Sequence, residues 1–204
     1  MTRRIAVAGF AAVVLAGGSA RRMGGSDKPS LVVAGRSLRD RVLDAVAAAD
    51  PTVVVGGRTD VPPGVRYTRE DPPGGGPVAA VAAGLAAVGP EPQVVALVAG
   101  DLPMLTTAAV TGLGHALSTA DGALFVDADG RRQLLCGVWR PDSLRRRLTA
   151  LASAGHGASM RALIEPLRVV EVSWAGDGPP PWFDCDTEED LRMVREWLTA
   201  KRAG

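Results

Sequence analysis

Short apolar runs alternate with longer Ala- and Leu-rich stretches over the first 120 residues, and this alternation constrains the fold more than any other feature. The short runs have strand length, and the longer stretches repeat apolar positions every three or four residues, as helices do. The expected strands are residues 11–15, 52–55 and 94–99, and the expected helices are residues 38–49, 78–88 and 107–118. Alternating strands and helices form βαβ units, whose parallel sheet carries helices on both faces. We therefore predict an α/β fold, a three-layer sandwich with a mostly parallel sheet.

The C-terminal half departs from this alternation. Strand-like runs recur at residues 123–126, 134–138 and 167–172, and the sequence DADGR at residues 127–131 is typical of a hairpin turn. We therefore expect a small antiparallel excursion there. The last segment has an acidic start and an apolar stripe, which predicts a helix capped by Thr187. A chain of 204 residues predicts one domain, or one domain with a small additional lobe.

Composition excludes several classes of function. With 23 basic and 22 acidic residues the net charge is +1, which argues against a nucleic-acid-binding groove and a polybasic membrane surface. Two cysteines without a Cys-x-x-Cys pair exclude a disulfide scaffold and a Cys-based zinc ribbon. Because the 23 basic residues include only two lysines, a lysine inside a glycine-rich loop stands out.

The uncharged run at residues 5–18 has two interpretations. Preceded by Arg3 and Arg4, it resembles a secretory signal peptide. It also has the continuous apolar character of a buried strand in a parallel sheet. We favour the strand and a cytoplasmic protein, because cleavage would remove the strand that holds the loop described next.

The loop from Leu15 to Lys28 combines glycines with three cations. Glycines let the backbone approach a ligand and present N–H groups to an anion, while Arg21, Arg22 and Lys28 add positive charge. The loop is not a Walker A motif, because Lys28 follows Asp27 rather than Gly. A flexible glycine turn is the alternative, but the position after a central strand favours a phosphate site.

Carboxylates stand at two further positions. Asp101 follows the apolar run 94–99, at the sheet edge where α/β proteins bind ligands, and beside a polyphosphate it would hold Mg²⁺. The alternative is a cap on the following turn. Asp184 and Asp186, two residues apart, would face the same side of an extended segment. Asp186 is either a second metal ligand or the cap of the last helix.

Four segments, in order along almost the whole chain, resemble the signature series of the molybdenum cofactor nucleotidyltransferases. They are LAGGSARRMGGSDK from Leu15, GGGPVAAVAAGL from Gly74, VAGDLPML from Val98 and FDCDTEEDL from Phe183. The opening loop resembles the guanylyltransferase (MobA-like) branch, whose pattern is LAGG…RMGG-x-DK. The resemblance implies one Rossmann-like nucleotidyltransferase domain over residues 1–204, with a nucleotide-binding half at about 1–120 and an acceptor-binding half at about 121–204.

The resemblance also implies an activity and its site. The enzyme would join the GMP moiety of GTP to the phosphate of molybdopterin cofactor, release pyrophosphate and use Mg²⁺. Its substrates would be GTP and molybdopterin, with other proteins of cofactor biosynthesis as further partners, and no nucleic acid or membrane. The implied catalytic residues are Arg22, Lys28 and Asp101, and the implied metal ligands are Asp101 and Asp186. The implied nucleotide contacts are Leu15, Ala16, Gly17, Gly18, Lys28, Asp71, Gly76 and Asp101.

Three departures from the family pattern affect the substrate more than the chemistry. The chain has Asp184-Cys-Asp186-Thr where the guanylyl branch often has Asn-x-Asn-Thr. The family's Gly-Pro-Leu-Ala-Gly reads Gly76-Pro-Val-Ala-Ala80, and the acidic residue upstream of it is either Glu70 or Asp71. The alternatives are therefore transfer of CMP, or of another NMP to a phosphosugar-like acceptor, and a nucleotide-binding module without turnover. A secreted protein with a cleaved leader is a further alternative.

Overall fold

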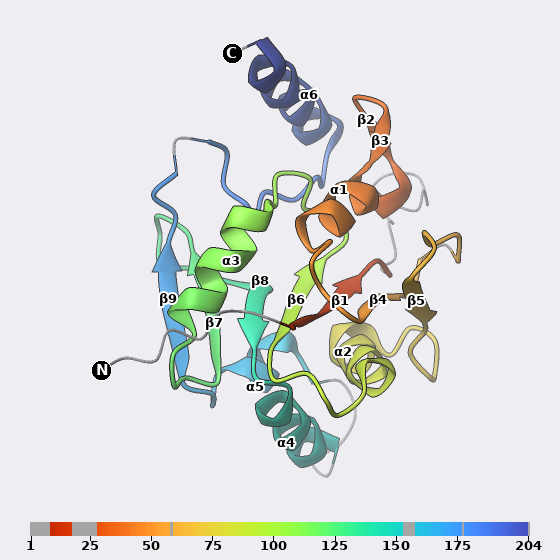
Figure 1. The fold of residues 1–204 in the computed structure, drawn as a ribbon, viewed down its shortest axis with the longest axis vertical. Helices are drawn as coiled ribbons and strands as arrows, with labels where there is room; N and C mark the ends of the chain where they lie inside the picture. Colours follow the sequence, from red (N-terminus) through yellow and green to blue (C-terminus); the bar gives the residue numbers. More distant parts are fainter. Residues whose placement is uncertain (1–8, 18–27, 58, 153–157, 177, 204) are drawn as a thin grey trace.

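A sheet of seven strands forms the centre of the computed structural model, which describes residues 9–17, 28–57, 59–152, 158–176 and 178–203 (Figure 1). In order across the sheet the strands are β5 (Val65–Thr68), β4 (Thr52–Val55), β1 (Ala11–Leu15), β6 (Val95–Ala99), β8 (Arg132–Trp139), β7 (Gly122–Val126) and β9 (Val169–Ser173). Central β1 pairs in parallel with β4 and β6, and all five of its residues are buried. Burial from both faces explains why this strand reads as a continuous apolar run.

One strand runs against the others. β8 is antiparallel to both β6 and β7, and β7 is in turn parallel to β9. The β7–β8 connection turns at residues 127–131, where Gly130 has a φ of +75° and donates its N–H to the carbonyl of Asp127. The predicted hairpin and antiparallel excursion are therefore confirmed, within an otherwise parallel sheet.

Helices cover both faces of the sheet and make the fold a three-layer sandwich. α1 (Leu38–Ala45) and α3 (Thr107–Ala116) pack on one face around Val14, Val98 and Phe125. α2 (Gly76–Val88), α4 (Pro141–Ala152) and α5 (Met160–Ile164) lie on the other face, around Val13 and Trp139. Both cores are built mainly from aliphatic side chains.

A third cluster holds the C-terminal helix. α6 (Glu188–Ala203) packs on a small antiparallel hairpin, β2 (Val32–Val33) and β3 (Arg36–Ser37), which follows the 3₁₀ turn Lys28–Ser30. Figure 1 shows this helix beside the hairpin at one end of the molecule. Leu191 and Val194 of α6 are buried against Val33 and Leu38. The helix therefore packs against the residues that follow Lys28 in the chain.

The predicted strands and helices are confirmed with shifted ends, and several elements were not predicted. α1 ends at Ala45 rather than residue 49, although Val46 beyond it is still fully buried. The edge strand β5, the β2–β3 hairpin, α4 and α5 were missed. Within the described ranges, no helix is both long enough and apolar enough to span a bilayer.

Candidate active site

The carboxyl ends of β1 and β6 bring two predicted site segments together. Leu15 pairs with Ala99, and the N–H of Gly100 donates to the Leu15 carbonyl at 2.8 Å. A Cβ on Gly100 would lie 3.2 Å from the Cα of Ala16, so a larger residue would push the two strand ends apart. The glycine before Asp101 therefore allows that carboxylate to follow directly beside residues 15–17.

The end of β4 approaches the same point through a second glycine contact. Gly56 has a φ of +73°, and a Cβ there would lie 2.9 Å from the Cα of Gly17. The Gly17 N–H donates to the Val55 carbonyl at 3.1 Å. Sequence reasoning did not single out Gly56, although a Gly-Gly pair directly after a buried strand was the available signal. Three strand ends thus form a tight backbone floor beneath the site.

Lys28 joins two aspartates that are far apart in sequence. Its Nζ lies 2.7 Å from Oδ2 of Asp101 and 2.5 Å from Oδ1 of Asp186. The Lys28 and Asp101 side chains are 16% and 20% exposed, whereas that of Asp186 is 54% exposed. Of the three predicted catalytic residues, Lys28 and Asp101 are therefore adjacent, and the predicted second metal ligand adjoins them.

The start of α6 fixes the position of Asp186. Thr187 caps the helix, because its Oγ1 accepts from the Asp190 N–H at 3.1 Å. The Asp190 carboxylate in return accepts from the N–H groups of Thr187 and Asp186 at 2.7 and 2.9 Å. Because Thr187 and Asp190 form this reciprocal capping box, the Asp186 carboxylate does not take part in the cap and pairs with Lys28 instead. The cap predicted for Thr187 is confirmed, and Asp186 does not provide it.

Burial and charge shift three pKa values around this cluster. Burial lowers the pKa of Lys28, but its hydrogen bonds to Asp101 and Asp186 outweigh that effect and raise the pKa above its ordinary value. Burial and the neighbouring Asp186 charge raise the pKa of Asp184. Burial raises the pKa of the Cys185 thiol to about 12, which excludes a reactive thiolate at neutral pH.

Of the two adjacent acids, Glu70 rather than Asp71 faces the backbone contact between Gly17 and Gly56. Oε1 of Glu70 accepts from the Gly74 N–H at 3.1 Å. Oε2 is buried, has no hydrogen-bond partner among the described residues, and lies 3.7 Å from the position of a Cβ on Gly56. Asp71 is exposed. The two acids differ in their burial, which the sequence does not reveal, so the sequence could not show which of them faces the site.

The remaining predicted residues divide into three groups. Gly76 is exposed at the start of α2 with a φ of +83°. Leu15 and Ala16 are buried at the end of β1, so they offer backbone rather than side chain to a ligand at this edge. Gly18, Arg21 and Arg22 lie outside the described residues.

The donor set suits a hard divalent cation bound together with phosphate. The Asp101 and Asp186 carboxylates already converge on one ammonium group. In the described ranges, no three His, Cys, Asp or Glu side chains gather in a metal-binding group. Mg²⁺ is commonly held by one or two carboxylates, with phosphate oxygens and water completing its shell. Two carboxylates and a lysine beside a glycine-lined edge can therefore hold a polyphosphate and its cation.

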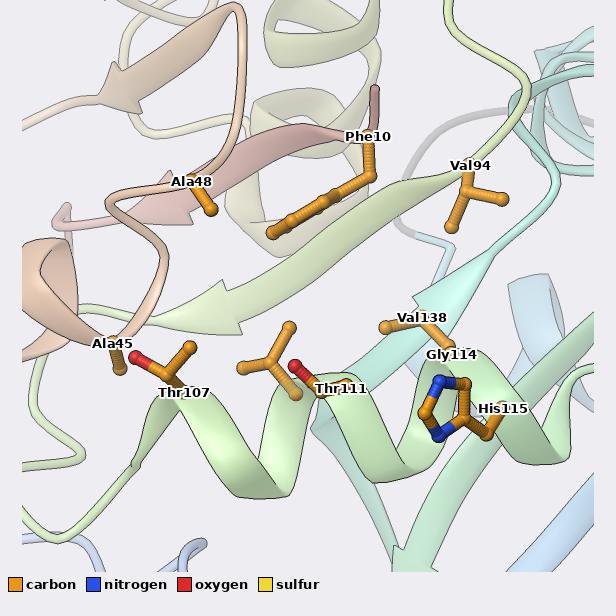
Figure 2. Close-up of a pocket in the computed structure, with 10 residues that line it drawn as sticks. Phe10, Ala45, Ala48, Val94, Thr107, Thr111, Gly114, His115 and Val138 are labelled. Carbon is orange, nitrogen blue, oxygen red and sulfur yellow. The ribbon is translucent and has the colours of Figure 1, made fainter. Parts of the chain in front are cut away.

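Two clefts lie away from this cluster, at the opposite edge of the sheet. Figure 2 shows the first, an apolar cleft where Phe10, Val94 and Val138 at the strand ends face Thr111 and His115 of α3. The second is polar and adjoins the start of α4. No predicted site residue lines either cleft.

Comparisons with known proteins identify relatives of this fold. A family described as the MobA-like NTP transferase domain matches residues 12–172. A molybdenum cofactor guanylyltransferase of Bradyrhizobium sp. (strain ORS 278) is 33% identical over 188 residues, covering 88% of each chain.

Two solved structures share the fold. Molybdopterin-guanine dinucleotide biosynthesis protein A from Archaeoglobus fulgidus superposes with a TM-score of 0.71 at 18% identity, covering 94% of this chain and 99% of its own. The 2-C-methyl-D-erythritol 4-phosphate cytidylyltransferase from Thermus thermophilus gives a TM-score of 0.67 at 18% identity, covering 91% and 97%. Since enzymes named for different nucleotides share the fold, the fold does not select the base.

Proposed function

Because the chain belongs to the MobA-like NTP transferase family, a family of nucleotidyltransferases, we propose that it transfers GMP from GTP to the phosphate of molybdopterin cofactor. An oxygen of the acceptor phosphate forms a bond to the α-phosphorus of GTP. The bond from that phosphorus to the α,β-bridging oxygen breaks, and pyrophosphate leaves with the electron pair. The guanylyltransferase names of relatives 33–34% identical over most of the chain support this choice of substrates.

One observation carries the proposal: the Lys28 ammonium lies within 2.7 Å of both the Asp101 and the Asp186 carboxylates, beside the backbone of residues 15–17. The main obstacle to this reaction is the approach of two polyanions and the charge that develops on pyrophosphate. A lysine next to backbone N–H groups at a glycine-rich edge reduces that repulsion by electrostatics and positioning.

Asp101 and Asp186 are the residues that would hold Mg²⁺. When bound, the ion would neutralise phosphate oxygens and favour departure of pyrophosphate. Lys28 would then lend its charge to the phosphates, and its placement between two acids keeps it protonated at neutral pH. No strong general base is needed, because the acceptor phosphate is already an anion.

Glu70 is the acid that we expect at the nucleotide. Its buried Oε2 without a partner among the described residues is an acceptor beside the Gly17–Gly56 contact. A donor from the nucleoside would satisfy it, and a buried acceptor left unsatisfied costs about 1–3 kcal/mol. The adjacent pair allows a matched test: Glu70→Gln should raise the KM for GTP at least about tenfold, and Asp71→Asn should leave it nearly unchanged.

A pyrophosphate-release assay with molybdopterin as acceptor tests the activity. GTP should support release, while CTP and ATP should not. Turnover with CTP but not GTP would instead establish the cytidylyl alternative. We retain this alternative because Asp184-Cys-Asp186 departs from the pattern of the guanylyl branch. GTP binding without release with any acceptor would identify a binding module. Asp186→Ala should weaken Mg²⁺ binding, and an unchanged Mg²⁺ affinity would remove Asp186 from the metal site.

A further inference from the structure

A polar cleft opens at the amino-terminal edge of the sheet, opposite Lys28 and Asp101. It encloses about 320 Å³, which is at the lower end of the usual size range of small-molecule sites. Its walls come from the residues before β6 and β7, the start of α4 and the residue before β9. Elements distant in sequence thus meet around one polar hollow.

Positive charge dominates this cleft. Arg140, Arg146 and Arg168 line it, together with Asp121 and Asp142 as the acidic residues. Asp142 is already paired from outside the cleft, because Arg145 Nη1 lies 3.0 Å from its carboxylate. The lining therefore carries three guanidinium groups and two carboxylates, a net charge of +1, and Arg145 adds a positive charge just outside it.

The second acid belongs to a network that holds the guanidinium groups in place. Asp121 accepts from the buried Ser143 Oγ at 2.7 Å and from the Arg168 N–H at 2.9 Å, and Arg168 Nε lies 3.5 Å from it. The same Ser143 Oγ accepts from Arg146 Nη2 at 2.9 Å. Arg140 is fixed separately, because it donates to the carbonyls of Ser118 and Ala120.

These hydrogen bonds do not use every N–H donor of the three guanidinium groups. A guanidinium has five N–H donors in a planar fork that matches phosphate oxygens. Arg140 and Arg168 tie the strand ends together, which alone would explain their presence. Arg146 makes no such tie: among the described residues its guanidinium forms a hydrogen bond with Ser143 alone, one turn earlier in its own helix. α4 also begins at this cleft and turns its positive end toward it.

We propose that the cleft formed by Arg140, Arg146, Arg168 and Ser143 binds the phosphate group of a small molecule, at a site separate from the Lys28–Asp101–Asp186 cluster. The net positive charge of the lining and its three guanidinium groups suit the oxygens of a phosphate group. The Arg140 guanidinium, which two carbonyls already hold, loses little conformational freedom on binding, and this favours affinity. The phosphate could come from free inorganic phosphate or from a phosphomonoester, and titrations with both distinguish these sources.

The experiment titrates inorganic phosphate, and in parallel ribose 5-phosphate, into the ¹⁵N-labelled full chain. Amide signals of Asp121, Asp142 and Ser143 should shift with saturation. Arg146→Gln should weaken this binding at least about tenfold, equivalent to about 1.4 kcal/mol. Arg192→Gln on α6, which removes the same charge from an exposed pair, should not weaken it. Tighter binding of ribose 5-phosphate than of phosphate identifies a phosphomonoester, and equal binding identifies free phosphate.

Because phosphate could also bind at the candidate active site, a Lys28→Ala variant separates the two sites. In that variant the shifts around α4 should persist with unchanged affinity. The proposal is overturned if the only shifts in the intact chain occur around Gly17 and Asp101, or if Arg146→Gln binds as well as the intact chain. Since Arg146 is exposed, its replacement should leave the fold intact, and the shifts in the unsubstituted chain test the site without any variant.

Discussion

Removing the charge of Lys28 should reverse the effect of a second substitution at Asp186. In the intact chain Lys28 stabilises two carboxylates, so Asp186→Asn should cost a small amount of stability. Lys28→Met keeps most of the side-chain volume but leaves Asp101 and Asp186 facing each other without a cation. In that background, Asp186→Asn should stabilise the protein, because it relieves the repulsion between the acids.

The structure sets the size of this reversal. Both carboxylate oxygens lie within 2.7 Å of one nitrogen, so they are at most about 5 Å apart, where two charges repel by about 3 kcal/mol at an effective dielectric of about 20. The Asp186 side chain is 54% exposed, and solvent screening reduces the effect to about 1 kcal/mol. We therefore expect a coupling free energy of about 1 kcal/mol between positions 28 and 186.

Urea unfolding of the intact chain, both single variants and the double variant measures this coupling, with divalent cations chelated. The coupling should shrink in about 1 M salt, where the Debye length is about 3 Å. Arg192→Met, which breaks an exposed pair on α6, is the matched control and should change stability little. If Asp186→Asn costs the same free energy with and without Lys28, the bridging role assigned to the lysine is refuted.

Three further predictions test separate parts of the structure. Asp101→Ala should reduce turnover at least about a hundredfold in the pyrophosphate-release assay, a loss of about 2.7 kcal/mol, and normal turnover would remove the residue from the site. Gly56→Ala should cost about 1–3 kcal/mol of unfolding free energy, and more than Gly130→Ala, because both have positive φ but only Gly56 also lacks space for a Cβ; equal losses in urea melts would contradict the contact. Burial raises the pKa of Asp121, but hydrogen bonds from Ser143 and a backbone N–H outweigh it and lower the pKa. Its charged form therefore adds stability above the unfolded pKa of about 3.9, and the advantage over Asp121→Asn should disappear as pH falls through the lower folded value; a difference equal at pH about 3 and about 7 would disprove this linkage.

The central strands were predictable because a strand that is buried on both faces consists almost entirely of apolar residues. β1 and β6 are continuous apolar runs, and their shared edge places Asp101 beside residues 15–17 as predicted. β5 was missed because it lies at the sheet edge, half-exposed, with Arg66 inside a four-residue strand. α4 was missed because three consecutive arginines obscure its buried stripe, of which Leu144 is the fully buried member.

The candidate site was predictable as a set of residues but not as a set of contacts. The sequence indicated Lys28, Asp101 and Asp186 separately, from a loop, a strand end and a capped helix. Their meeting at one ammonium depends on α6 packing over the β2–β3 hairpin, a long-range arrangement that no local pattern encodes. The alignment left the upstream acid open between Glu70 and Asp71, and Asp71 was the predicted nucleotide contact, because the burial that distinguishes them is not visible in the sequence.

The antiparallel course of β8 has a mechanical consequence. This strand is bonded on one side to β6, which leads to Asp101, and on the other to β7, which belongs to the C-terminal half. The two halves of the chain therefore share one continuous sheet. A hinge rotation of one half against the other would break backbone hydrogen bonds along β8. A movement that encloses a ligand at the carboxyl edge would therefore have to involve described elements outside the sheet, such as α6.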